Sequence, residues 1–284
     1  MEPWIVPLFA GVYGLLIGSF LNVCSLRWPV DESVVRPRSK CPGCDTPIAW
    51  YDNVPVLSWL VLRGRCRRCG EPISVQYPLA ELATGLLWAA MFALHGPTWE
   101  ALRGSVFLTV VFGISMSDAR FFIIPDEFSI GGTVVGLAMA FLPGGIEWVP
   151  AFIGAALGYG LLWFVGVAGT WLIRRMSPGR LEEAGVDQAM GGGDVKMMMM
   201  VGAFLGPWGV ALTIFLGSVL ALLATLVRVT AATLRAQAEG EDVFGRLIPF
   251  GVFLAGGAGI AYVWGDAMVG WYLGSIVGRS AWRG

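Results

Sequence analysis

The sequence predicts an all-α polytopic membrane protein with about eight transmembrane segments and a small cytoplasmic domain resembling a zinc ribbon. The first observation is composition: 56% of the 284 residues are hydrophobic and only 14% are charged, whereas soluble domains carry about 25% charged residues. The second is that the apolar residues gather in stretches approaching the roughly 20 residues that cross a bilayer. The third is a pair of CxxC sequences within the longest polar segment. A formal net charge of −1 excludes the strongly basic balance of a dedicated nucleic-acid binder.

Eight apolar segments follow one another, at residues 4–24, 78–95, 104–118, 128–143, 149–173, 195–206, 209–228 and 247–265. The first has no basic residues before it, so we interpret it as retained and not as a cleaved signal peptide. The sixth is too short to span as a straight helix. Because it follows Gly191, Gly192 and Gly193, we expect a broken or re-entrant element there. Three successive glycines also allow positive φ angles and the close approach of a substrate strand. Residues 266–278 could lie in the interface or re-enter, which leaves the side of the C-terminal tail open.

The basic residues predict the orientation. If the segments are threaded alternately from an external N-terminus, 16 of the 19 Lys and Arg residues fall on one side, eight of them within residues 25–77. The opposite loops hold only Arg103. Because cytoplasmic loops are rich in Lys and Arg, we expect residues 25–77 and the connections around 119–127, 174–195 and 229–246 to be cytoplasmic.

Two pairs of glycines have the GxxxG spacing that lets membrane helices approach closely. They are Gly14 with Gly18 and Gly154 with Gly158. We interpret both as sites of tight helix packing.

Four of the five cysteines form two CxxC pairs separated by 21 residues, Cys41 with Cys44 and Cys66 with Cys69. Two such pairs present four thiolates to Zn²⁺, with a small ribbon between them. Two disulfides are the alternative, but they need an oxidising compartment, and the charge distribution places this segment in the cytoplasm. A site made only of thiolates leaves no position for water, so the predicted zinc is structural. Cys24 lies outside this cluster and is interpreted as a packing residue.

Three aspartates stand at the cytoplasmic ends of membrane segments, where ionisable groups suggest function: Asp118, Asp126 and Asp194. The single histidine, His95, falls at the opposite end of its segment, too far away to serve a cytoplasmic Ser or Cys triad. A pair of carboxylates can share one proton, so that one activates water while the other polarises a carbonyl. On the residues alone, the alternative stays open that Asp118 and Asp194 cap helices or pair with Arg120 and Lys196, and that Asp126 caps the next helix. Lys196 is two positions from Asp194 and so on another helix face, and we interpret it as extending to lipid headgroups.

Several motifs together resemble the prepilin leader peptidases, which are bifunctional membrane aspartic peptidases of type IV pilus and type II secretion systems. The N-terminal signature is similar to Gly18-Ser19-Phe20-Leu21-Asn22-Val23, and the cysteine-bearing domain is similar to residues 38–81. The block around Asp118 with Ile124-Pro125-Asp126 resembles the one that carries the first catalytic aspartate. The stretch from Gly191 to Lys196 resembles the GxGD block, with a third glycine at its variable position, and Ile248-Pro249-Phe250-Gly251 resembles a late signature.

This resemblance implies cleavage of the basic leader of prepilins and pseudopilins after a glycine, at the cytoplasmic face of the bacterial inner membrane. It assigns catalysis to Asp118 and Asp194 and not to Asp126. It also implies N-methylation of the new N-terminal residue with S-adenosylmethionine as methyl donor. The chain shows no GxGxxG after a strand to mark a nucleotide site. Glu81 and Asn22 are candidates for the methyl-transfer site by buried polarity alone, and a structural role is preferred for both.

The predicted domains are the first transmembrane segment at 1–24, the zinc-binding domain at 25–77 and the transmembrane peptidase domain at 78–284. A transporter or proton channel using intramembrane carboxylates is the alternative function, although its acidic residues should form a relay across the bilayer. A membrane adaptor presenting a zinc ribbon is a third hypothesis, and it leaves the glycines before Asp194 without a purpose.

Overall fold

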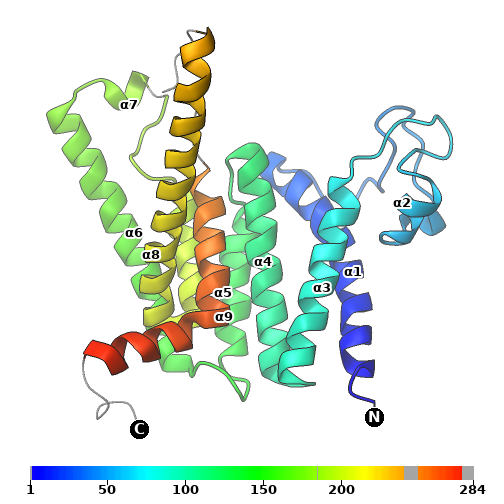
Figure 1. Ribbon diagram of the computed structural model, residues 1–284, viewed down its shortest axis with the longest axis horizontal. Coiled ribbons are helices and arrows are strands. Elements are labelled where there is room, and N and C mark those ends of the chain that lie inside the picture. Colours follow the sequence, from blue (N-terminus) through cyan, green and yellow to red (C-terminus); the bar gives the residue numbers. More distant parts are fainter. Residues whose placement is uncertain (1, 184, 240–248, 277–284) are drawn as a thin grey trace. The chain divides into compact units, whose positions relative to one another are not determined.

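The structure, a computed structural model, describes residues 2–183, 185–239 and 249–276, and it is helical apart from its turns and loops (Figure 1). Within these ranges there is no β-strand, only two isolated β-bridges. The elements in chain order are α1 (Ile5–Arg27), η1 (Trp28–Val30), η2 (Trp50–Asn53), α2 (Leu57–Val61), α3 (Gln76–His95), α4 (Trp99–Phe121), α5 (Asp126–Met139), α6 (Trp148–Met176), α7 (Arg180–Glu183), α8 (Gly192–Glu239) and α9 (Phe250–Ile276). The all-α fold class is confirmed.

Among the described residues, six helices are long and apolar enough to cross a membrane: α1, α3, α4, α6, α8 and α9. The predicted number of about eight membrane segments is higher than this number of helices for two reasons. Helix α5 has only 14 residues, and the predicted sixth and seventh segments are the two halves of α8, which counts once. Residues 266–276, where an interfacial or re-entrant path was left open, continue α9 as helix. Residues 247, 248, 277 and 278 of the predicted segments lie outside the described residues.

The chain divides into two compact units. Unit 1 comprises Met1–Gly113 and Leu142–Gly145, and unit 2 comprises Ile114–Phe141 and Ile146–Gly284. Helix α4 belongs to both, and its last turns, which carry Asp118, belong to unit 2. The two features that the sequence singled out lie in different units. The paired cysteines lie in unit 1, and Asp118 and Asp194 lie in unit 2.

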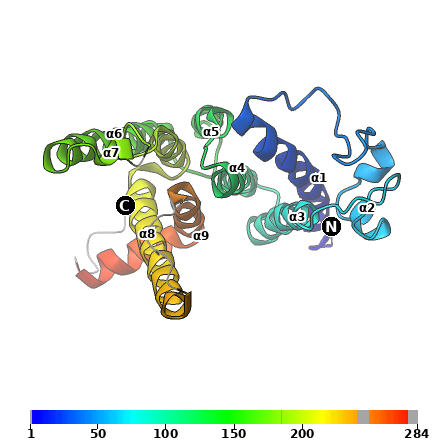
Figure 2. The same cartoon turned by 90° about the horizontal axis from the view of Figure 1, so that it is seen from above.

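In unit 1, α1 packs against α3 along its glycines (Figure 2). A Cβ atom on Gly14 would lie 2.8 Å from Cβ of Trp88, and one on Gly18 would lie 2.7 Å from Cα of Glu81. Since real Cβ contacts are never this short, any side chain at these positions would push the helices apart. The close packing predicted from the first GxxxG pair is confirmed.

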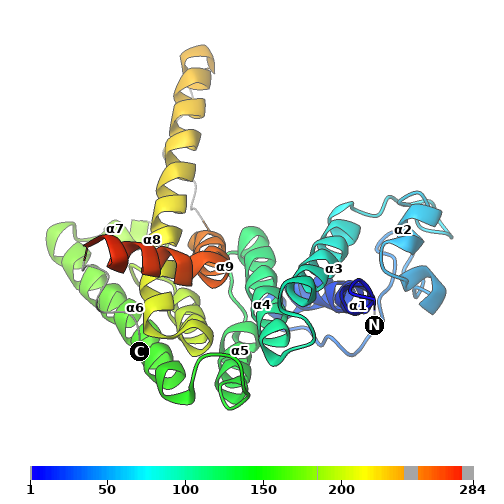
Figure 3. The same ribbon diagram turned by 60° about the horizontal axis from the view of Figure 1, so that its bottom comes forward.

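In unit 2, the second GxxxG pair brings α6 onto the first half of α8, which run side by side in Figure 3. A Cβ atom on Gly154 would lie 2.3 Å from the carbonyl oxygen of Gly202, and one on Gly158 would lie 2.1 Å from that of Met198. The contact is therefore backbone to backbone, with no side chain that could move aside. This prediction of close packing is also confirmed.

Gly158→Ala is expected to destabilise unit 2 by about 1–3 kcal/mol, the usual range for overpacking. Gly160→Ala is the matched control, because a Cβ atom there meets nothing within 4 Å and alanine favours the helix. Thermal unfolding of the two variants in detergent checks this. A Gly158→Ala protein as stable as the Gly160→Ala protein would contradict the close packing.

Helix α8 consists of two helices joined at Gly206, where φ is 70° and ψ is −171°, just before Pro207. The first half is antiparallel to α6, since Gly158 faces Met198 while Gly154 faces Gly202. The second half is antiparallel to α9, where Gly217 and Gly257 meet backbone to backbone. The broken element expected from the sequence is thus confirmed, but the break lies at its end and not at the glycines that precede it.

Candidate active site and cysteine cluster

Asp118 lies in the last turn of α4 and is 6% exposed. The helix ends just beyond it, where Phe122 adopts a φ of 57° and donates its N–H to the Asp118 carbonyl. The side-chain Oδ2 of Asp118 accepts a hydrogen bond of 3.0 Å from the backbone N–H of Val252, in the first turn of α9. A carboxylate is stabilised at a helix N-terminus by such N–H groups.

Gly251 makes this contact between α4 and α9 possible. A Cβ atom at Gly251 would lie 2.8 Å from Asp118 Oδ2 and equally close to Cδ1 of Ile124. Any larger residue would displace the carboxylate or the start of α9. The late motif that ends in Gly251 therefore has a physical role beside Asp118, which the sequence did not indicate. Ile248, the first residue of that motif, lies outside the described residues.

Asp194 is half-buried at the start of α8. The residue before it, Gly193, packs so closely on Ile124 that a Cβ atom there would lie 2.9 Å from Cβ of Ile124. Ile124 is therefore wedged between the first residues of α8 and α9, beside Asp118. The carboxyl groups of Asp118 and Asp194 lie close enough to interact electrostatically. The structure thus brings together the two aspartates of the predicted pair.

The three glycines before Asp194 act through close approach and not through positive φ. None of Gly191, Gly192 and Gly193 has a positive φ angle, so that part of the expectation was wrong. A Cβ atom on Gly191 would lie 3.1 Å from Oδ2 of Asp194, whereas one on Gly192 would meet nothing within 4 Å. The structure therefore explains the outer two glycines, and nothing in it explains the middle one.

Asp126 lies apart from the pair and is bound to Lys196. It is the first residue of α5, with a side chain 55% exposed, and its two carboxylate oxygens accept hydrogen bonds of 2.7 and 2.8 Å from Lys196 Nζ. Because Lys196 is two positions from Asp194 and so on another helix face, we expected it to extend to lipid headgroups and not to pair with Asp194. The headgroup role was wrong, because Lys196 Nζ binds Asp126 at the start of α5.

The remaining polar candidates have structural contacts. Nδ1 of His95, at the end of α3, lies 3.3 Å from Oε1 of Glu100. Asn22 donates to the Tyr77 carbonyl at 3.1 Å. Glu81 is 8% exposed, and its Oε2 accepts the Val56 N–H at 2.7 Å. Asn22 and Glu81 therefore tie α1 and the segment before α2 to α3.

The four paired cysteines form one cluster in unit 1. Their sulfur atoms all lie within 4.8 Å of one another, and the Sγ atoms of Cys41 and Cys69 are 3.7 Å apart. Of the described residues, this is the set of Cys, His, Asp and Glu side chains placed to hold a metal ion. Cys24 is buried in α1, away from the cluster, as expected of a packing residue.

The cluster is built from two copies of one turn, at residues 40–47 and 65–72. In the first, the Cys41 N–H donates to the Thr46 carbonyl and the Asp45 N–H to the Cys41 carbonyl. In the second turn, 25 residues later, the Cys66 N–H donates to the Glu71 carbonyl and the Gly70 N–H donates to the Cys66 carbonyl. Each copy closes with an antiparallel bridge to a proline. The shared pattern C-x-x-C-x-x-P-I is visible in the sequence and would have predicted this repeat.

The surroundings of the sulfurs favour the thiolate form of Cys44 and Cys66. Hydrogen bonding with the Thr46 side chain and backbone lowers the pKa of Cys44 to about 6, and backbone hydrogen bonds from Cys69 and Arg68 lower the pKa of Cys66. The pKa of Cys69 is raised to about 12, although a backbone hydrogen bond at Glu71 lowers it, because burial and the neighbouring sulfurs oppose another negative charge. A divalent cation among the four sulfurs would offset the repulsion between their negative charges.

Two family models match the chain. One, described as the bacterial peptidase A24 N-terminal domain, matches residues 12–95, which include the four clustered cysteines. The other, described as the type IV leader peptidase family, matches residues 105–226, which include Asp118 and Asp194. The two features of the structure thus fall in separately matched segments.

Proteins named prepilin leader peptidase/N-methyltransferase are similar over most of the chain. That of Aeromonas hydrophila is 33% identical over 295 residues, covering 95% of each chain. That of Stutzerimonas stutzeri is 34% identical over 296 residues, covering 96% of this chain and 95% of the relative. That of Myxococcus xanthus (strain DK1622) is 42% identical over 202 residues, which are 70% of this chain but only 57% of that protein. No solved structure matches.

Proposed function

Because the chain belongs to the prepilin leader peptidase/N-methyltransferase family of A24 aspartic peptidases, we propose that Asp118 and Asp194 are its catalytic pair. The substrates are prepilins or pseudopilins, cut after a glycine at the end of a basic leader. The observation that carries this assignment is the meeting of α4, α8 and α9 around Ile124, which brings Asp118 and Asp194 together and leaves Asp126 outside.

The pair would work as a base and an acid. The Val252 N–H bound to Asp118 favours the charged form of that carboxylate, so Asp118 accepts a proton from the attacking water. Protonated Asp194 hydrogen-bonds to the scissile carbonyl, whose carbon receives the water oxygen. The C–N bond then breaks as the departing amine takes the proton that Asp118 accepted from the water, and this amine becomes the new N-terminus.

We place the protein in the bacterial inner membrane with this site at the cytoplasmic face. Arg120, Arg174 and Arg175 lie in the last turns of α4 and α6, and Lys196 lies in the first turns of α8. These are the ends at which the aspartates stand, and clustered basic residues mark the cytoplasmic side. A substrate with a basic leader in the cytoplasm and an apolar stem in the bilayer presents its scissile bond at this level.

We also assign a structural zinc ion to Cys41, Cys44, Cys66 and Cys69. Tetrahedral coordination with Zn–S distances of about 2.3 Å separates the sulfurs by about 3.8 Å, and the sulfurs of Cys41 and Cys69 are 3.7 Å apart. The proposed division of the chain is a first membrane segment at 1–24, a zinc-binding domain at 25–77 and a peptidase domain at 78–284. S-adenosylmethionine, when bound, supplies the methyl group for the new N-terminal amine.

Mass spectrometry of a prepilin incubated with the purified protein tests the whole proposal. We expect a product cut after the leader glycine, and a further mass of one methyl group only when S-adenosylmethionine is present. Ion flux through reconstituted protein without any peptide product would favour the transport alternative instead.

The Asp126–Lys196 ion pair should affect cleavage only slightly. Both side chains are well exposed, and exposed pairs contribute about 0–1 kcal/mol. Asp126→Asn and Lys196→Gln are therefore each expected to reduce kcat/KM by at most about fivefold, and the double variant by no more than the worse single variant. Initial rates of cleavage measure this. A loss of more than a hundredfold in Asp126→Asn would place Asp126 in the catalytic machinery.

A further inference from the structure

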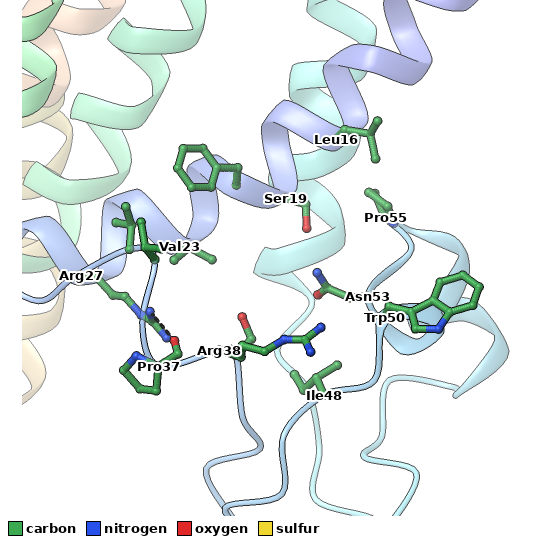
Figure 4. A pocket seen from close by; sticks show the side chains of 14 residues that line it. Leu16, Ser19, Val23, Arg27, Pro37, Arg38, Ile48, Trp50, Asn53 and Pro55 are labelled. Carbon is green, nitrogen blue, oxygen red and sulfur yellow. Dashed lines mark hydrogen bonds between the residues drawn. The ribbon is translucent and has the colours of Figure 1, made fainter.

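A cavity of about 380 Å³ lies in unit 1 beside the C-terminal half of α1 (Figure 4). One wall is a single face of that helix, formed by Leu16, Ser19, Phe20, Val23 and Arg27, whose spacing places them in one row. The other wall comes from residues 34–55 of the cysteine-bearing segment. The cavity is therefore enclosed by a membrane helix on one side and by a polar domain on the other.

The second wall carries groups suited to a charged, aromatic ligand. Figure 4 shows the side chains of Arg38 and Asn53 directed into the space between α1 and this wall. No carboxylate of the described residues lies within ion-pair distance of Arg38. Trp50, which also lines the cavity, is 75% exposed. An available guanidinium, an amide and an uncovered indole thus line one wall.

These groups match three parts of S-adenosylmethionine, namely its carboxylate, its adenine and its ribose. A guanidinium binds a carboxylate through paired hydrogen bonds, an indole face stacks on adenine, and an amide or hydroxyl bonds ribose hydroxyls. The volume lies within the roughly 300–1,000 Å³ of small-molecule pockets. We infer that this cavity binds S-adenosylmethionine, with Arg38 on its carboxylate and Trp50 on its adenine. The inference rests on the proposed methyltransferase activity and gives that activity a site.

The wall of the cavity is held in place by buried groups. Glu81, in α3, accepts a hydrogen bond of 2.7 Å from the Val56 N–H, and it packs beside Gly18, the neighbour of the lining residue Ser19. Val56 has a φ of 61°, an unfavourable value for a β-branched residue. Glu81 stabilises this turn, next to Pro55 of the lining. Glu81 is thus a positioning residue for the cavity.

The cysteine cluster supports the same wall. Asp52, in η2 beside Trp50 and Asn53, is bound by Arg67, which lies between the two cysteines of the second pair. The Arg67 Nε donates to both carboxylate oxygens at 2.9 and 3.1 Å, and Nη2 donates at 2.6 Å. A closed cluster therefore fixes η2, and with it Trp50 and Asn53 of the lining.

The test measures binding of S-adenosylmethionine and of S-adenosylhomocysteine to the purified full-length protein in detergent, by titration calorimetry without any prepilin. Arg38→Gln and Trp50→Leu should each raise the Kd by about tenfold or more, as expected for a lost charge-assisted bond or a lost stacking contact. Arg63→Gln is the matched control, since it removes one positive charge from the same domain away from the lining. Zinc content of each variant shows that the domain is intact.

Three results would overturn the inference. One is unchanged affinity in both Arg38→Gln and Trp50→Leu with zinc retained. Another is a photocrosslink of labelled S-adenosylmethionine to peptides outside residues 16–55. The third is wild-type protein that cleaves prepilin but binds no S-adenosylmethionine, which would leave the peptidase proposal standing. If the wild-type protein instead binds the methyl donor but cleaves nothing, the peptidase proposal fails and the cavity remains.

Discussion

Asp118→Asn and Asp194→Asn are each expected to reduce leader cleavage by about a thousandfold or more. One carboxylate acts as a general base and the other as a general acid, and each such role contributes about 10²–10⁴-fold to the rate. Asparagine has nearly the size of aspartate but can neither take up nor release the proton. For Asp118 the substitution preserves an oxygen that can accept the Val252 N–H, so the contact with α9 survives while the chemistry is lost.

Single-turnover cleavage of a prepilin, followed by mass spectrometry, measures this loss. Asp126→Asn is the matched control, because it neutralises a third aspartate at the same end of the helices, whose partner is the exposed Lys196. Thermal unfolding should be similar for all three variants. Substantial cleavage by either Asp118→Asn or Asp194→Asn would contradict the two-carboxylate mechanism, regardless of the activity of Asp126→Asn.

Loss of the metal is expected to unfold the cysteine-bearing segment. Cys44→Ser and Cys69→Ser should reduce bound zinc from about one per chain to nearly none, and make residues 25–77 sensitive to protease. Zinc contributes about 10–16 kcal/mol in zinc-finger peptides at neutral pH, more than a core of this size provides. The segment has no strand or long helix of its own among the described residues, only η1, η2, α2 and the two cysteine turns.

Cys24→Ala is the control for this experiment, since Cys24 lies in α1 outside the cluster. It should keep its zinc and its resistance to protease. Metal analysis of protein purified without chelator gives the zinc content, and limited proteolysis with mapped cut sites gives the state of the segment. A Cys44→Ser protein with full zinc would contradict the four-thiolate site.

Local features of the sequence predicted much of the fold. Long apolar segments predicted the membrane helices because each helix satisfies its own backbone hydrogen bonds. The GxxxG pairs predicted close packing because one missing side chain on each turn is sufficient for it. The spacing of Cys41, Cys44, Cys66 and Cys69 predicted a single cluster because metal ligation demands four sulfurs near one point.

Features that depend on distant segments escaped prediction. The sequence does not reveal that Gly251 must be small because Asp118 stands opposite, since 133 positions separate them along the chain. We expected Lys196 to extend to lipid headgroups, whereas its actual partner, Asp126, is at the start of α5. In each case the contact joins residues that are far apart in the chain, and the local sequence does not show which distant residue will be the partner.

The shortness of two helices in unit 2 has a consequence for the surrounding lipid. Helix α5 and the first half of α8, from Gly192 to Leu205, each have 14 residues, which span about 21 Å. They fall about 9 Å short of the hydrocarbon thickness, and a bilayer adapts to such mismatch by thinning. A substrate helix of ordinary length is then too long for the membrane beside the enzyme. Its first turns would emerge from the lipid into water, and the bond to be hydrolysed would come with them.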